Sequence, residues 1–209
     1  MSRNYHCFGY LFAVAVAMPA AAIGPQAEAV QRAWDNAQFG LDGDESKTAM
    51  KKLVAECESL VTKHAEDAEV LTWCGITNST FAGMVGALSA MKYAKAAKAN
   101  LEKAIELAPD VVNGGAKSSL GTLYFKVPGW PIGFGNDDKA RELLTAGLAI
   151  NPEGIDSNYF YADFLIEEKD FASARIHLER ALAAPARPGR EIADEGRRAD
   201  VQASLLKLD

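Results

Sequence analysis

The sequence predicts an all-α fold, built as a solenoid of stacked antiparallel helix pairs with a C-terminal capping helix. Three segments share one pattern, in which a leucine is followed by the last turns of an apolar helix and then by a proline that ends it. These segments are residues 101–109, 144–152 and 178–185. Apolar residues elsewhere recur at helical spacing, and no stretch alternates as a half-buried strand would. Because one helix pair cannot bury its apolar face alone, we expect the pairs to stack.

The spacing of the repeated leucines indicates the kind of solenoid. Leu144 and Leu178 lie 34 residues apart, which is the period of tetratricopeptide arrays. Leu101 and Leu144 lie 43 residues apart, so this interval is interpreted as one repeat with about nine extra residues. The extra residues fall in the glycine- and proline-rich loop 128–136.

Helical periodicity and helix-breaking residues place the individual elements. In the N-terminal half the expected helices cover residues 26–39, 46–63, 68–82 and 92–107, separated by turns at 40–44 and 64–67 and a bend at 83–87. After the inserted loop, Asp137 or Asp138 is expected to cap the next helix. The expected helices of the C-terminal half cover the segment around 120–125, then a helix up to residue 150, and residues 159–168, 172–184 and 191–208.

The first 22 residues are interpreted as a secretory signal peptide. Arg3 supplies the positive start, residues 7–18 form an apolar run, and residues 19–22 offer a cleavage site after Ala22. A membrane anchor is the alternative, but it needs about 20 apolar residues. We therefore expect a periplasmic protein whose mature part, residues 23–209, is a single helical-repeat domain without a further membrane span.

The charge balance and the absence of catalytic motifs argue against several function classes. Acidic residues number 28 against 22 lysines and arginines, whereas a nucleic-acid partner requires a basic face. The sequence contains no nucleophile elbow, no phosphate-binding glycine loop and no zinc-protease motif. We therefore expect neither an enzyme nor a cofactor, and no nucleic-acid partner.

Two cysteines of the expected mature chain lie symmetrically about a predicted turn. Cys57 and Cys74 are equidistant from residues 64–67, so they could meet in the seam between two antiparallel helices. Export would permit a disulfide, and two small buried thiols are the alternative. A metal site is not expected, because His64 and His177 have no ligand spacing to either cysteine.

Two segments are candidates for a surface that binds a partner or ligand. Loop 128–136 combines Trp130, Ile132 and Phe134 with three glycines and two prolines, which favour a stiff loop with tight turns. These side chains either fill a gap between repeats or form a cavity wall or partner surface. The second candidate contains Asn158, Tyr159 and Tyr161, at the start of a helix of the kind that lines the concave face; ordinary packing is the alternative.

A cluster of basic residues stands out in this acidic chain. Its members are Arg187, Arg190, Arg197 and Arg198. We expect these side chains to be solvated or paired with the neighbouring acids Glu191, Asp194 and Glu195. Anion binding is the alternative.

Several segments together resemble a known family. Residues 118–135, 151–156, 158–161, 187–190 and 196–198 are similar to exported bacterial tetratricopeptide proteins that form the T component of TRAP-type transporters. The resemblance covers about Trp34 to Leu206, with departures at Cys74 and in the bend 83–87. It implies an all-helical periplasmic protein that associates with a substrate-binding component and is not a catalyst.

The sequence therefore predicts a non-enzymatic periplasmic adaptor that binds a partner protein. The resemblance points to a solute-binding component of a TRAP-type transporter as this partner. A carrier that encloses a small apolar ligand between its helices is the alternative, because the glycines at 83–86 and the loop around Trp130 could open a channel.

Overall fold

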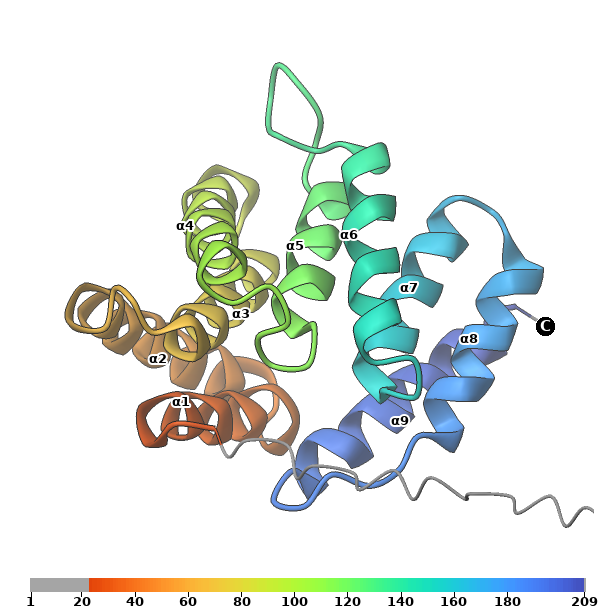
Figure 1. The fold of residues 1–209 in the computed structure, drawn as a ribbon, viewed down its shortest axis with the longest axis horizontal. Coiled ribbons are helices and arrows are strands. Elements are labelled where there is room, and N and C mark those ends of the chain that lie inside the picture. Colours follow the sequence, from red (N-terminus) through yellow and green to blue (C-terminus); the bar gives the residue numbers. More distant parts are fainter. Residues whose placement is uncertain (1–22, 209) are drawn as a thin grey trace, which may run out of the picture.

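The computed structural model describes residues 23–208, so the predicted signal peptide lies outside the described residues. Within this range the chain is all-α, without a β-strand (Figure 1). The elements are α1 (Pro25–Asp35), the π-helical turn η1 (Asn36–Gly40), α2 (Gly43–Lys63), α3 (Ala68–Met84), α4 (Ala87–Leu107), α5 (Gly115–Lys126), α6 (Asp137–Ile150), α7 (Ile155–Glu167), α8 (Phe171–Ala183) and α9 (Glu191–Leu206).

Three antiparallel helix pairs, α3/α4, α5/α6 and α7/α8, form the stacked array, and α2 packs against α3 (Figure 1). The leucines that align the repeated segments, Leu101, Leu144 and Leu178, are all buried in the second helix of a pair. Gly75 and Gly121 allow the first helix of two pairs to approach closely. A β-carbon at either glycine would lie 2.7 Å from Cγ of Leu101 or Leu144, respectively. The predicted solenoid of helix pairs is confirmed.

Side-chain caps begin three of these helices, and one of them differs from the prediction. Asp67 caps α3 and Asp170 caps α8. The cap of α6 is Asn136, whose side chain accepts a hydrogen bond of 2.8 Å from the third helical N–H, and not Asp137 or Asp138. The two aspartates occupy the first helical turn, where negative charge favours the positive end of the helix dipole.

The N-terminal core is held by aromatic packing and by a disulfide. Trp34 of α1 and Trp73 of α3 are buried with their ring centroids 6.0 Å apart. Cys57 of α2 and Cys74 of α3 form a disulfide with a Cα–Cα distance of 5.3 Å, and neither residue is exposed. Of the two arrangements that the sequence left open, the structure has the covalent one, which joins α2 to the first helix pair.

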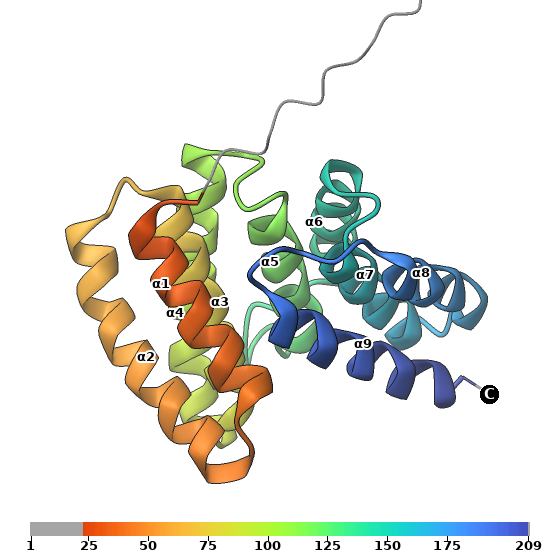
Figure 2. The same cartoon turned by 90° about the horizontal axis from the view of Figure 1, so that it is seen from below.

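The C-terminal helix closes the array in addition to capping it. After the last helix pair, α9 packs against α8 and α7 and also contacts η1, so the last described helix reaches back to the N-terminal helices (Figure 2). Gly196 of α9 permits this contact, because the ring of Phe39 fills the space that a β-carbon would occupy. A repeat period predicts contacts between neighbouring repeats, and it gives no indication of this closure.

Candidate functional site

The base of the inserted loop between α5 and α6 is fixed by backbone hydrogen bonds. The N–H of Gly135 donates to the carbonyl of Pro128 at 2.9 Å, and the N–H of Asn136 donates to the carbonyl of Tyr124 at 2.8 Å. Gly135 is required at this position, because a β-carbon there would overlap the carbonyl oxygen of Val127. The two sides of the loop are therefore held to each other and to the end of α5.

The tip of the loop is also closed by backbone hydrogen bonds. The N–H groups of Ile132 and Gly133 both donate to the carbonyl of Gly129, each at 3.1 Å. The peptide bond between Trp130 and Pro131 is cis. The loop is thus an ordered excursion, and Figure 1 shows it rising beyond the ends of α5 and α6.

Phe134 is the aromatic side chain of the loop that faces the protein. Its ring packs edge-to-face on the buried Tyr124 at a centroid distance of 5.6 Å and lies against the central core. The ammonium group of Lys98 lies 5.8 Å from the centre of the Phe134 ring, within the range of a cation–π interaction. For Phe134 the structure has the packing arrangement that the sequence allowed as one alternative.

Trp130 and Ile132 face in the opposite direction. Trp130 is 89% exposed and Ile132 is 75% exposed. Large apolar side chains gain free energy on burial, so their exposure on an ordered loop marks a binding surface more strongly than a single exposed residue on a flat helix would. Phe134 therefore anchors the loop to the protein, while Trp130 and Ile132 are exposed to solvent.

The exposed face of α4 continues this surface. The loop touches α4 at Met91, since a β-carbon at Gly133 would lie 2.9 Å from the Met91 methyl carbon. One turn before Met91 is Leu88, which is fully exposed, and Lys92 and Lys95 follow on the same face of the helix at the i+4 and i+7 positions. We call the set Leu88, Lys92, Lys95, Trp130 and Ile132 the tip surface.

Asn158 has a different environment from the one expected for a partner surface. It is completely buried, and its side-chain amide donates to the carbonyls of Pro152 at 2.8 Å and Gly154 at 2.9 Å. Its side-chain oxygen lies 2.9 Å from Nδ1 of His177 in α8. Asn158 therefore holds the start of α7 and connects it to α8.

The two predicted tyrosines are covered in part by neighbouring helices. The guanidinium group of Arg197 in α9 lies 4.4 Å from the centre of the Tyr159 ring, and burial raises the pKa of the Tyr159 phenol although Arg197 opposes this. Tyr161 packs edge-to-face on His177 at 4.9 Å. The structure therefore does not bring the second candidate surface, Asn158 with the two tyrosines, together with Trp130 and Ile132. Helix α9 lies over Tyr159.

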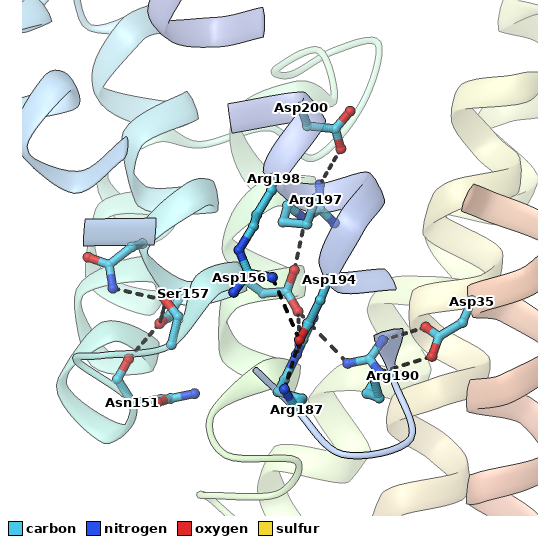
Figure 3. Close-up of polar contacts among 12 residues, drawn as sticks. Asp35, Asn151, Asp156, Ser157, Arg187, Arg190, Asp194, Arg197, Arg198 and Asp200 are labelled. Carbon is cyan, nitrogen blue, oxygen red and sulfur yellow. Dashed lines mark hydrogen bonds and ion pairs between the residues drawn. The ribbon is translucent and has the colours of Figure 1, made fainter. Parts of the chain in front are cut away.

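The predicted basic cluster forms an ion-pair network centred on Asp156, which sequence reasoning did not identify (Figure 3). One carboxylate oxygen of Asp156 accepts from Nε of Arg197 at 2.8 Å, and the other accepts from Nη1 of Arg187 at 2.6 Å. Burial alone would raise the pKa of the Asp156 carboxyl, but the charges of Arg197, Arg187 and Arg190 outweigh it and hold this pKa well below its ordinary value.

The same network connects α1 and α9, the first and last helices of the described range. Arg190 pairs through two nitrogens with the buried carboxylate of Asp35 at the end of α1, with one N–O distance of 3.0 Å (Figure 3). Asp194 accepts from both the backbone N–H and Nε of Arg187, at 2.8 and 2.6 Å. Of the three acids expected to pair with the arginines, Asp194 does so, while the central partner, Asp156, lies 31 residues before Arg187 in sequence.

Two further kinds of feature, a metal site and a membrane-spanning helix, were expected to be absent from the mature chain. Within residues 23–208, no three His, Cys, Asp or Glu side chains are grouped so that they could hold a metal ion. In the same range, no helix combines the length and the apolar character needed to cross a bilayer.

Comparison with known families identifies part of the array. Residues 86–111, which comprise α4 and the turn after it, match the family model of the tetratricopeptide repeat. This part of the chain is similar to a tetratricopeptide repeat. Together with the three stacked helix pairs, the match gives this protein a tetratricopeptide-like solenoid fold, a fold that presents extended surfaces for binding other proteins. A search of curated proteins found no match to the chain.

Proposed function

We propose that this tetratricopeptide-repeat protein is a non-enzymatic adaptor that binds a partner protein through the tip surface. The observation that carries the proposal is Trp130, which is 89% exposed on a loop whose backbone is closed by hydrogen bonds. A large side chain that is already held in place loses little conformational entropy on binding. Tryptophan is also enriched among the residues that dominate binding energy at protein interfaces.

The proposal also specifies where the protein acts and which protein it binds. The protein acts in the periplasm, and its partner is a solute-binding component of a TRAP-type transporter. The signal-like residues 1–22 and the resemblance at residues 118–135 and 151–161 support this. The matched repeat supports the class of activity, since such arrays bind proteins, and it does not identify the partner.

Asn158, Tyr159 and Tyr161 are assigned a supporting role in this proposal. Asn158 is buried, and the two tyrosines pack against His177 and Arg197 of neighbouring helices. They fix the positions of α7, α8 and α9 relative to one another, so they shape the array without forming the contact surface.

Co-purification from the native envelope tests the location of the interface. We expect Trp130→Ser combined with Ile132→Ser to weaken partner capture at least about 30-fold, the range for loss of a tryptophan hot spot. Phe171→Ser is the matched control, because Phe171 is also an exposed aromatic residue, 50% exposed, but begins α8. Capture that is unchanged in the double variant, or equally reduced in the control, would remove the interface from the tip surface.

Mass spectrometry of the purified protein tests export and the alternative function. An N-terminus at Ile23 in protein from the periplasmic fraction would support cleavage after Ala22, and an intact N-terminus in the cytosol would contradict it. Native mass spectra are expected to show the empty chain. A co-purifying apolar small molecule would instead favour the carrier that encloses a ligand between helices.

A further inference from the structure

The tip surface carries a local positive charge although the chain as a whole is acidic. Between Glu69 and Glu102 the sequence contains no Asp or Glu, yet it contains Lys92, Lys95 and Lys98. This segment includes most of α3 and the first three-quarters of α4. An acid-free stretch of this length is unusual in a chain with a net charge of −6.

Two of the three lysines in this acid-free segment are available to an external anion. Lys98 pairs with Glu102 at 2.7 Å. Lys92 and Lys95 are exposed and form no ion pair with any residue in the described range 23–208. The ammonium group of Lys92 lies 5.3 Å from the centre of the Tyr93 ring. The nearest acidic side chains in sequence to the loop are Asp137 and Asp138, exposed on the first turn of α6 beyond its C-terminal end.

The shape of the surface indicates what kind of partner it fits. Trp130 and Ile132 stand on a projecting loop, and a projecting loop fits a concave site on a partner better than a flat one. The net charge of −6 would oppose binding to an anionic membrane, and the exposed acids Asp137 and Asp138 follow the loop directly in sequence. A protein patch interacts mainly within a Debye length, and Lys92 and Lys95 are the charged members of the tip surface.

We propose that the partner is a protein with an apolar pocket bordered by carboxylates, in which the pocket receives Trp130 and Ile132 and the carboxylates face Lys92 and Lys95. This rests on the proposed adaptor function and specifies the chemistry of its partner. The apolar contact sets how long the complex lasts, and the lysines set how fast it forms, because rim charges act mainly on the association rate.

Site-specific photocrosslinking in the native cells tests this pairing. The probe is a benzophenone side chain introduced at position 132, and the yield of protein adduct is measured in intact chain and in three variant backgrounds. These are Trp130→Ser, the charge reversal Lys92→Glu with Lys95→Glu, and the matched reversal Lys51→Glu with Lys52→Glu on the exposed face of α2. Circular dichroism confirms that each variant is folded.

The expected result has two parts. Adduct yield falls at least about tenfold in Trp130→Ser, and roughly tenfold in the α4 charge reversal and on raising the salt from about 0.05 to 0.5 M. It stays unchanged in the α2 reversal. The cross-linked peptides of the partner are expected to contain or adjoin Asp and Glu residues.

Different failures separate the two proposals. If Trp130→Ser abolishes the adduct but the α4 charge reversal and salt do not, the adaptor proposal stands and the acidic partner is wrong. If the partner still co-purifies but no adduct forms at position 132, the interface lies elsewhere and both are wrong.

The tryptophan fluorescence of the unmodified protein tests the membrane as occupant. Trp34 and Trp73 are buried, so Trp130 is the exposed one of the three tryptophans. Vesicles of phosphatidylglycerol and phosphatidylcholine are expected to leave its emission and its quenching by acrylamide unchanged. A blue shift with protection from acrylamide, or phospholipid adducts at position 132, would overturn the acidic-protein partner in favour of a bilayer.

Discussion

The loop between α5 and α6 and the connection between α8 and α9 are both short segments that contain proline and glycine, yet they are fixed in different ways. Residues 127–136 are held by their own backbone hydrogen bonds and by one inward aromatic ring, that of Phe134. Residues 184–190 are held by the side chains of Arg187 and Arg190, which pair with acids on α1, α7 and α9.

The difference determines what each segment can do. In the loop the backbone supplies the order, so Trp130 and Ile132 are free for another role and remain exposed. In the connection the side chains supply the order, so its charges are compensated within the protein. The two regions should therefore be sensitive to different substitutions, the connection to loss of charge and the loop to added bulk at its backbone.

The largest expected effect is on stability, in the closing network. Asp156→Asn removes the charge that faces Arg187 and Arg197, leaving partly buried guanidinium groups without their partner. We expect the free energy of unfolding to fall by about 3 kcal/mol. Urea denaturation monitored by circular dichroism measures it. Asp200→Asn, which removes a more exposed partner of Arg197, is the control and should cost less than about 1 kcal/mol.

Lowering the pH is expected to remove the stabilisation that the ion pairs of Asp156 provide. Because the pKa of Asp156 is lower in the folded state, its ion pairs contribute fully above the ordinary carboxyl pKa of about 4. This contribution is lost as the pH falls through the lower folded-state pKa. The difference in unfolding free energy between the wild type and Asp156→Asn is therefore expected to stay constant between about pH 7 and 5 and to shrink below about pH 4. Denaturation curves across this range measure the difference, and a difference that does not shrink between about pH 4 and 2 would contradict the assignment.

The next expected effect is on the backbone of the loop, where a substitution tests whether the loop is closed as the comparison states. Gly135→Ala places a β-carbon against the carbonyl of Val127, so we expect a loss of about 1–3 kcal/mol and an opened loop. Gly83→Ala is the matched change at a helical glycine with open space, where alanine should stabilise by up to about 1 kcal/mol. Equal effects of the two substitutions on urea denaturation would show that the base of the loop is not tightly closed.

The smallest expected effect is on the outward side chain of the same loop. Trp130→Ser should change the free energy of unfolding by less than about 0.5 kcal/mol, because Trp130 packs on little of the protein. Phe134→Ala, the inward counterpart, should cost more, since its ring contacts Tyr124 and the core. A destabilised Trp130→Ser protein would mean that this side chain supports the fold and is not reserved for binding.

The sequence predicted which segments form helices, but it did not predict the surroundings of one of the two candidate binding surfaces. Most helices lie where the apolar periodicity placed them, but α4 begins at Ala87 and not at residue 92, and α7 begins at Ile155 and not at residue 159. The cap of α6 is Asn136 and not Asp137 or Asp138. The loop was located by the 43-residue interval between Leu101 and Leu144 and by its glycine and proline content. For Asn158, Tyr159 and Tyr161, a position on the first helix of a pair predicted a concave surface, but the path of α9 over that helix depends on contacts with η1 that lie far away in sequence.

By itself, the sequence determined an all-α array of helix pairs, because apolar periodicity and the spacing of Leu101, Leu144 and Leu178 are local properties of the chain. Only the tertiary structure decided that the array closes on itself through Arg190 and Asp35, and that Trp130 points outward while Phe134 points inward. Ion pairs and side-chain directions of this kind arise when distant segments meet, and no period or local preference encodes such a meeting.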